Sequence, residues 1–367
     1  MGVKLCRMEF KYPEYDGNSI YNLACLLSES VGIKTNGKPL DLNLEKDKTI
    51  LILIDGFGIN YIKKLNIKNY KIITTVFPST TATVMTTLFT AKTPGEHGVI
   101  GYTNYSNDLG IINAMRYTFN GLDINESLTT LKDFNEEFNV DSYLKRTDKS
   151  VVSILPGRMD KSTFTGAING RKYLNYKSFW DSLYLLNRAV NLNYDFIYYY
   201  LPYVDSMAHS YGTYEKPAMD AAEEIYSKIS QEVEKFKDKY NIIITADHGH
   251  FPVSENVMMN DRKDLLNKLD VMPYGDSRAL FLRTRYSIDD LLNFNDTEIF
   301  DKEKIIKSNM LGNIDDRFIN RIGDYLIVPH DGKAFIYQSK IDDNYHLLKS
   351  HHGGLTMDEQ LIPLFYI

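Results

Sequence analysis

A run of six apolar or β-branched residues, Thr49–Ile54, leads directly into Asp55 and constrains the fold more than any other feature. A continuous apolar run of this length is typical of a strand that is buried on both faces of a sheet. Such strands occur in parallel sheets whose two faces are covered by helices. Further strand-like runs are Lys71–Val76, Ser150–Leu155, Phe196–Leu201 and Asn241–Ala246.

Helix-like segments separate these runs, and the alternation predicts the fold class. The expected helices are Ser19–Glu29, Ile59–Leu65, Thr81–Ala91, Phe179–Val190 and Pro217–Lys237. Strands that alternate with helices predict an α/β fold with a mainly parallel central sheet sandwiched by helices. Residues 103–148 and 254–345 fit this alternation poorly. We therefore expect them to be insertions that form a cap on a single domain of residues 1–367.

The composition limits the partners that the chain can have. The formal net charge of −6 gives no broad electrostatic attraction to a nucleic acid polymer or an anionic membrane. Residues Met1–Pro13 contain charged side chains and no apolar core of a signal peptide, so we expect a cytoplasmic protein.

Only Cys6 and Cys25 are present, which excludes a disulfide scaffold but leaves one bridge open. The oligomeric state stays open.

Acidic residues follow three of the predicted strands. Asp55 and Asp247 come directly after their strands, and Asp205 follows Phe196–Leu201 within four residues. Because ligands collect at the carboxyl ends of strands in open α/β sheets, we expect these acids to meet at one edge. Histidines accompany them at positions 209, 248 and 352. Taken singly, each acid could cap a helix and each histidine could lie on the surface; together they suit zinc and its borderline neighbours.

A hydroxyl-rich segment precedes the predicted helix Thr81–Ala91. It reads Phe77-Pro78-Ser79-Thr80-Thr81, and helix capping is the ordinary explanation for such hydroxyls. A hydroxyl at a helix N-terminus also lies where backbone amides and the helix dipole favour a bound anion. If such a hydroxyl attacked a phosphate, the phosphate oxygens would meet those backbone amides.

Three other residues lie in or beside these motifs. We expect His97 to be structural, because Thr93–Gly98 is predicted to be a turn. Tyr203 or Tyr211 could stack on a base or aryl group, since both lie beside the Asp205 motif.

Taken in order, these motifs resemble the nucleotide pyrophosphatase/phosphodiesterase branch of the alkaline phosphatase superfamily. The matching pieces are Ile54-Asp55-Gly56-Phe57, Phe77-Pro78-Ser79-Thr80-Thr81 with Pro94-Gly95-Glu96-His97-Gly98, Asp205-Ser206-Met207-Ala208-His209, Ala246-Asp247-His248-Gly249 and His352-Gly353-Gly354. Each piece is weakly specific, but their joint order is highly specific.

The resemblance implies two divalent metal ions, with zinc expected first and manganese or iron as alternatives. One ion would be held by Asp55, Thr81, Asp247 and His248, and the other by Asp205, His209 and His352. It also implies that Thr81 is the nucleophile, with Thr80 as the fallback. The implied reaction is hydrolysis of a small phosphodiester or pyrophosphate of nucleotide type, in two in-line steps through a phosphothreonine ester.

One position departs from the pattern of the family. Val84 stands three residues after Thr81, where diesterases of this branch often carry an asparagine that steadies a phosphoryl oxygen. This departure keeps a phosphomonoesterase or a phosphonoacetate-type phosphonate hydrolase open as alternatives. A phosphoryl transferase and a non-catalytic, metal-stabilised binding module are further alternatives. Sulfatases are disfavoured, because neither cysteine begins a Cys-x-Pro-x-Arg segment.

Overall fold

The computed structural model describes residues 9–119, 127–339 and 347–367. Its main sheet has seven strands in the order β2-β18-β9-β1-β8-β6-β7. These strands are β2 (Lys71–Thr74), β18 (Leu361–Tyr366), β9 (Asn241–Thr245), β1 (Thr49–Ile54), β8 (Phe196–Leu201), β6 (Val151–Pro156) and β7 (Tyr173–Tyr176). All neighbouring pairs are parallel except those of β18, which runs antiparallel to both β2 and β9. The predicted fold class is therefore confirmed.

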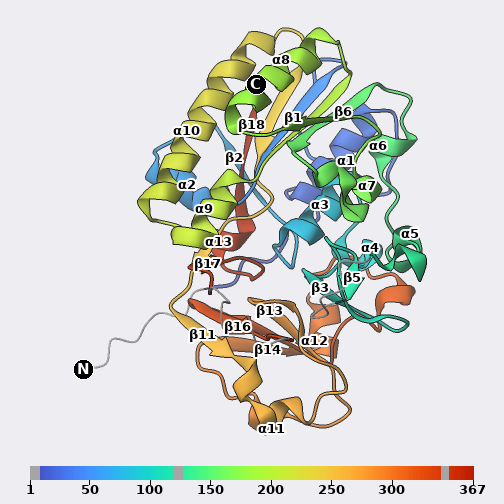
Figure 1. The fold of residues 1–367 in the computed structure, drawn as a ribbon, viewed down its shortest axis with the longest axis vertical. Coiled ribbons are helices and arrows are strands. Elements are labelled where there is room, and N and C mark those ends of the chain that lie inside the picture. Colours follow the sequence, from blue (N-terminus) through green and yellow to red (C-terminus); the bar gives the residue numbers. More distant parts are fainter. Residues whose placement is uncertain (1–8, 120–126, 340–346) are drawn as a thin grey trace.

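Helices cover both faces of this sheet (Figure 1). One side carries α1 (Ile20–Ser30), α3 (Thr81–Thr90), α6 (Tyr143–Arg146) and α7 (Thr163–Ile168), and the other carries α2 (Ile59–Lys64), α8 (Phe179–Asn191), α9 (Tyr203–Tyr211) and α10 (Lys216–Val233). The shorter helices are α4 (Pro94–His97), α5 (Phe134–Glu137), α11 (Lys263–Leu266), α12 (Lys302–Lys307) and α13 (Met357–Gln360). No helix among the described residues is both long and apolar enough to cross a bilayer.

The three central strands end at the same level. All six residues of β1 are buried, as expected for a strand with neighbours on both sides and helices on both faces. Ile54 pairs with Leu201 of β8, and Leu53 pairs with Thr245 of β9. Because these pairings are parallel, the segments that follow the three strands leave the sheet at one edge.

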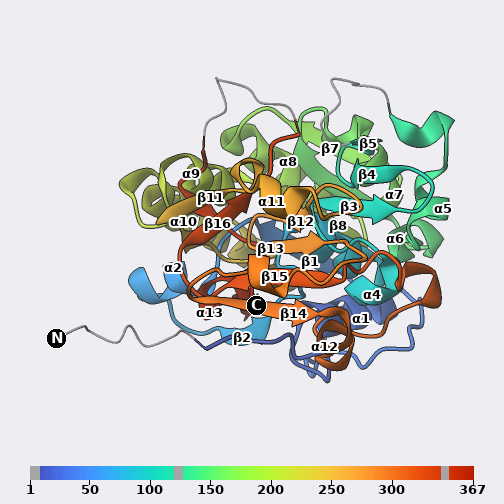
Figure 2. The same cartoon turned by 90° about the horizontal axis from the view of Figure 1, so that it is seen from below.

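Smaller sheets lie beyond that edge (Figures 1 and 2). A four-stranded antiparallel sheet contains β12 (Tyr274–Asp276), β13 (Ala279–Leu282), β15 (Tyr325–Pro329) and β14 (Thr297–Asp301). Two smaller sheets have two strands each, and they pair β11 (Glu255–Met258) with β16 (Lys333–Ile336) and β10 (Phe251–Pro252) with β17 (Ser350–His351). A three-stranded sheet has β4 (Gly110–Asn113) between β3 (Thr103–Ser106) and β5 (Thr118–Phe119). Most of these strands lie in the stretches expected to be insertions. The division into one domain with a cap stays a prediction.

Several boundaries differ from those expected. The strand expected at Lys71–Val76 ends at Thr74, and the helix expected at Pro217–Lys237 ends at Val233 before a 3₁₀ turn. The sequence patterns did not predict β7 or β18. Cys25 is a buried free cysteine, whereas Cys6 lies outside the described residues.

Candidate functional site

The three acids that follow the central strands meet at one edge of the sheet, as predicted. The backbone N–H of Asp205 donates to the carbonyl of Asp55 over 3.0 Å, which joins the ends of β1 and β8. The Gly56 N–H donates to Oδ1 of Asp247 over 3.1 Å, which joins the ends of β1 and β9. Asp55 and Asp247 are almost completely buried, whereas Asp205 stays partly accessible.

The three predicted histidines are oriented by backbone carbonyls. Nδ1 of His209 lies 2.8 Å from the Ser350 carbonyl oxygen, Nδ1 of His248 lies 3.1 Å from that of Gly249, and Nδ1 of His352 lies 3.1 Å from that of Ser79. A carbonyl oxygen only accepts, so each ring carries its proton on Nδ1. Nε2 is then the free lone pair, which is the arrangement found at histidines that bind metals.

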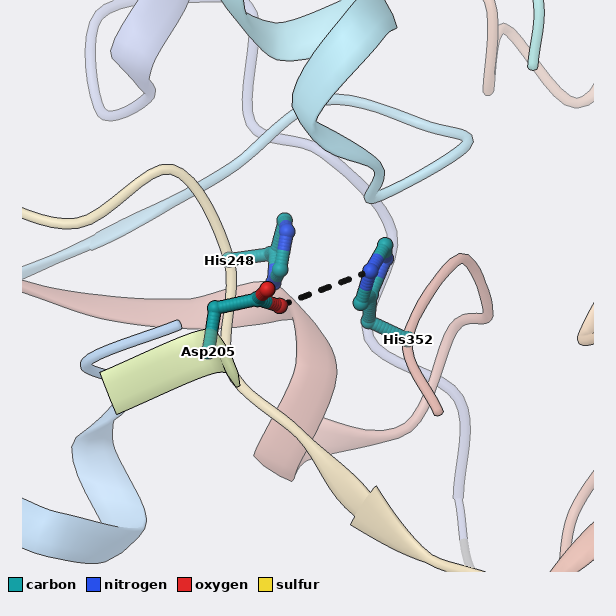
Figure 3. A group of neighbouring side chains, drawn as sticks. All are labelled: Asp205, His248 and His352. Atoms are coloured by element: carbon teal, nitrogen blue, oxygen red, sulfur yellow. Dashed lines mark ion pairs between the residues drawn. The ribbon is translucent and has the colours of Figure 1, made fainter. Parts of the chain in front are cut away.

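These Nε2 atoms lie among the carboxylates. Nε2 of His248 is 3.6 Å from Oδ1 of Asp55 and 3.4 Å from Oδ2 of Asp247. Nε2 of His209 is 3.2 Å from Oδ1 of Asp205, and Nε2 of His352 is 3.8 Å from the same oxygen. Figure 3 shows Asp205, which arises from α9, with the rings of His248 and His352 beside it.

Among the described residues, ligand-type atoms gather in three sets whose members lie within 4.8 Å of one another. Asp55, Asp247 and His248 form one set, as the resemblance implies. Asp205 belongs to two sets, one with His248 and His352 and one with His209 and His250. The implied partners of Asp205 are thus divided between two sets, and His250 is an additional member that the resemblance does not imply.

The buried carboxylates lack the partners that an anion needs. Oδ1 of Asp55 and Oδ2 of Asp247 are buried and accept no hydrogen bond from the protein. Burial, and then the charges of Asp247 and Asp205, raise the pKa of Asp55 well above its ordinary value. Buried like charges and unpaired oxygens are costly unless a cation balances them. The donor set therefore fits a divalent metal ion.

Thr81 begins α3 at the edge of this cluster. Its Oγ1 lies 3.1 Å from Nε2 of His248. Thr80 is the N-cap residue, but its side chain makes no capping hydrogen bond to the helix. The preceding Ser79 fixes the segment, because its hydroxyl donates to the Gly354 carbonyl over 2.9 Å and accepts from the Gly353 N–H over 3.1 Å. Thr81 and the His352 loop are thus held together.

A cavity of about 680 Å³ opens onto these groups. Asp55, Thr80, Thr81, Asp205 and His209 line it from the segments that follow strands of the main sheet. The rest of the lining comes from strands of the smaller sheets and the residues next to them, and it includes Tyr102, Tyr274, Asp276, Phe335, Tyr337 and His352. Burial raises the pKa of Asp276 to about 7. The site thus combines ionisable groups with an aromatic wall.

The structure places four other residues away from this cavity lining. The hypothesis that Tyr203 or Tyr211 stacks on a ligand is wrong for this cavity, because Tyr203 packs near Tyr176 and Tyr211 is exposed. His97 is buried and hydrogen-bonded to Thr87, as expected of a structural residue, but it ends the short helix α4 where a turn was expected. Val84 is fully buried in α3.

The fold and the site together define a class of protein. A mainly parallel sheet carries carboxylates and imidazoles at its carboxyl edge and a threonine at a helix start, which are the parts that the resemblance to the alkaline phosphatase superfamily implies. The chain belongs to the type I phosphodiesterase / nucleotide pyrophosphatase family, whose model matches residues 49–354. No curated protein sequence matches the chain.

Solved structures share this fold. Murine ectonucleotide pyrophosphatase/phosphodiesterase 5 is 17% identical, with a TM-score of 0.63 over 86% of this chain and 87% of that one. An inactive variant of the murine protein in complex with AMP is also 17% identical, with a TM-score of 0.64 over 87% of each chain. Phosphonoacetate hydrolase from Sinorhizobium meliloti 1021, in complex with phosphonoacetate, is 13% identical, with a TM-score of 0.62 over 87% of this chain and 89% of that one.

Proposed function

We propose that the protein is a metal-dependent hydrolase of small phosphodiesters or pyrophosphates of nucleotide type, with Thr81 as its nucleophile. Membership of the type I phosphodiesterase family supports the reaction class. The observation that carries the proposal is the position of Thr81 Oγ1, which lies 3.1 Å from His248 Nε2 and lines the same cavity as Asp55 and Asp205.

Two divalent ions would be held by the donors described above. Asp55, Thr81, Asp247 and His248 would bind one ion, and Asp205, His209 and His352 would bind the other. When bound, such a pair lowers the pKa of a hydroxyl or water and balances charge on the attacking and leaving oxygens. We propose zinc for both positions, because mixed imidazole and carboxylate donors suit it, with manganese or iron as substitutes.

The residues of the chain would act in two in-line displacements. Oγ1 of Thr81 releases its proton to solvent water and attacks phosphorus. The bond from phosphorus to the leaving oxygen breaks, and that oxygen departs as an anion that solvent can protonate. The phosphothreonine ester retains the other substituent of the substrate. Water then attacks the same phosphorus, the bond to Thr81 breaks and the hydroxyl is restored. The first amides of α3, which the Thr80 side chain leaves uncapped, would donate to the phosphoryl oxygens.

The cavity supports a substrate with an aromatic group. Tyr102 is 38% exposed and lines the same cavity as Thr80 and Thr81. An exposed aromatic face in a cavity can stack on a base or an aryl ring. The murine protein of the same fold binds AMP in one of its structures, which supports a nucleotide-type substrate here.

A phosphonate hydrolase is the second candidate. Val84 is buried and apolar at the position where resembling diesterases often carry asparagine, so its side chain offers no hydrogen bond to a phosphoryl oxygen. A structure of the same fold binds phosphonoacetate. Initial rates on bis-p-nitrophenyl phosphate, p-nitrophenyl phosphate and phosphonoacetate, with one metal-replete preparation, separate the candidates. Product analysis with added alcohols detects transfer of the phosphoryl group to an acceptor other than water.

Substitution of the two threonines tests the nucleophile. Thr81→Ala should abolish turnover of the diester while metal content, measured by elemental analysis, stays close to wild type. Thr81→Ser should retain activity, because it keeps a hydroxyl at the same position. Thr80→Ala is the matched control and should remain active. If Thr81→Ala turns over the diester and Thr80→Ala does not, the nucleophile is Thr80. If both variants are fully active, neither threonine is the nucleophile.

A further inference from the structure

His250 is a buried histidine whose ring faces the Asp205 carboxylate. Its Nε2 lies 3.0 Å from Oδ1 of Asp205, closer than Nε2 of His209 or of His352 lies to that oxygen. The His250 and His209 rings lie at a centroid separation of 4.8 Å and an interplanar angle of 81°. Three imidazoles therefore surround a single carboxylate oxygen.

Ser350 holds two of these imidazoles at once. Its backbone carbonyl lies 2.8 Å from Nδ1 of His209, and its hydroxyl lies 3.0 Å from Nδ1 of His250. A serine hydroxyl accepts as readily as it donates, so it can take the Nδ1 proton of His250 in a hydrogen bond. Nε2 of His250 is then a free lone pair that faces the same point as Nε2 of His209.

The backbone makes room for His250 at the end of β1. Gly56 has a φ of +74°, and a Cβ added there would lie 2.8 Å from Nε2 of His250. A side chain at position 56 would therefore displace the imidazole from Asp205. The absence of a side chain at Gly56 therefore lets the His250 ring lie close to Asp205.

We propose that His250 is a further protein ligand of the ion at Asp205, which makes that position imidazole-rich. This inference rests on the proposed metal-dependent function and extends its ligand set. The Asp205 position would then have donors from His209, His250 and His352, whereas the Asp55 position has two carboxylates, one imidazole and Thr81. Imidazole-rich sites prefer zinc and similar metals to magnesium or calcium. The Asp205 position should therefore fill first with zinc and reject magnesium.

The competing explanation is that His250 only donates a hydrogen bond from Nε2 to Asp205. A glutamine at position 250 separates the two explanations, because its amide donates a hydrogen bond to a carboxylate but is a poor zinc ligand. His250→Gln should behave as wild type if the ring is only a donor. It should lose affinity for zinc if the ring is a ligand.

Competitive titration of metal-free protein with zinc, against a chromophoric chelator, measures this affinity without any catalytic readout. We expect two binding steps in wild type, and in both His250→Gln and His250→Ala we expect the tighter step to weaken by more than about tenfold. His97→Gln is the matched control, because His97 is a buried histidine outside the three sets, and its two steps should match wild type. Unchanged zinc affinity in His250→Gln, with circular dichroism of the wild-type fold, would overturn the proposal.

Ser350→Ala provides a second variant in case substitutions at position 250 impair folding. It removes the hydroxyl that orients Nδ1 of His250 and keeps the carbonyl that orients His209. The tighter zinc step should weaken in this variant as well, and an unchanged step would contradict the proposal. Failure of this inference is distinguishable from failure of the proposed function. If the protein binds two zinc ions and neither affinity depends on His250, only this inference is refuted. If it binds one zinc ion and that affinity depends on His250, only the proposed second ion is refuted.

Discussion

Oγ1 of Thr81 lies 3.1 Å from Nε2 of His248, although 167 positions separate the two residues along the chain. The contact joins the start of α3 to the segment that follows β9, and so brings a hydroxyl to the carboxylates at the edge of the sheet. Nδ1 of His248 is held by the Gly249 carbonyl, which fixes the direction of Nε2. This relationship is the geometric basis of the proposed nucleophile.

Removal of metal should destabilise the protein. Without a cation, the buried carboxylates of Asp55 and Asp247 keep oxygens that have no hydrogen-bond partner. An ion that binds only the folded state adds about 2.7 kcal/mol to the free energy of unfolding when its concentration is 100 times Kd. Thermal unfolding of chelated protein titrated with zinc should show a rising Tm. Asp205→Asn should reduce that rise, and a Tm insensitive to zinc in wild type would contradict the proposed sites.

The buried pair of Arg278 and Glu359 should be important for stability. Both side chains are fully buried, and the guanidinium donates to the two carboxylate oxygens over 2.7 and 3.0 Å. Arg278→Met leaves the Glu359 charge buried without its partner, which should cost about 3–5 kcal/mol in urea unfolding. The double variant Arg278→Met/Glu359→Gln removes both charges and should cost less than the sum of the single variants. Additive costs would contradict this explanation.

Asp276 should make the stability of the metal-free protein depend on pH. Burial raises its pKa from 3.8 to about 7, so between these values the folded state binds more protons than the unfolded state. Its contribution to stability is therefore complete below about pH 4 and is lost as the pH rises through 7. The Tm of wild type relative to Asp276→Asn should fall across this range and level off above it. Parallel pH profiles for the two proteins would disprove the raised pKa.

The aromatic wall of the cavity should affect binding of aromatic substrates. Tyr102→Ala should raise KM for p-nitrophenyl esters, because a stacked aromatic pair contributes about 0.5–1.5 kcal/mol, which corresponds to a factor of about 2–12. Tyr211→Ala is the matched control, because Tyr211 is exposed and does not line the cavity. Equal KM values in wild type and Tyr102→Ala would show that the ring does not contact the substrate.

The positions of the acids could be predicted because they depend on local patterns. A continuous apolar run such as Thr49–Ile54 indicates a buried parallel strand, and parallel strands deliver their carboxyl ends to one edge. Asp55, Asp205 and Asp247 meet for this reason. By contrast, β18 contains Pro363, and proline argues against a strand that has neighbours on both sides.

The role of His250 and the contacts of Asp276 and Arg278 depend on pairings between distant segments. His250 belongs to the Asp-His-Gly-His motif, but its partners Asp205 and Ser350 lie 45 and 100 positions away. The sequence feature that could have indicated this role is a second histidine, His250, directly after His248 and Gly249. The hairpin of β12 and β13 carries no periodic pattern that indicates what it packs against. The arrangement of the smaller sheets is what brings side chains of this hairpin, such as Asp276, to the cavity.

Identification of the covalent ester tests the nucleophile most directly. Metal-replete protein is mixed with bis-p-nitrophenyl phosphate and quenched in acid within a few turnovers, and its peptides are then sequenced by mass spectrometry. The proposed reaction predicts a p-nitrophenyl phosphoryl group on Thr81, present in wild type and absent from Thr81→Ala. The same group on Thr80 or another side chain of a turning-over enzyme, with Thr81 unmodified, would contradict it.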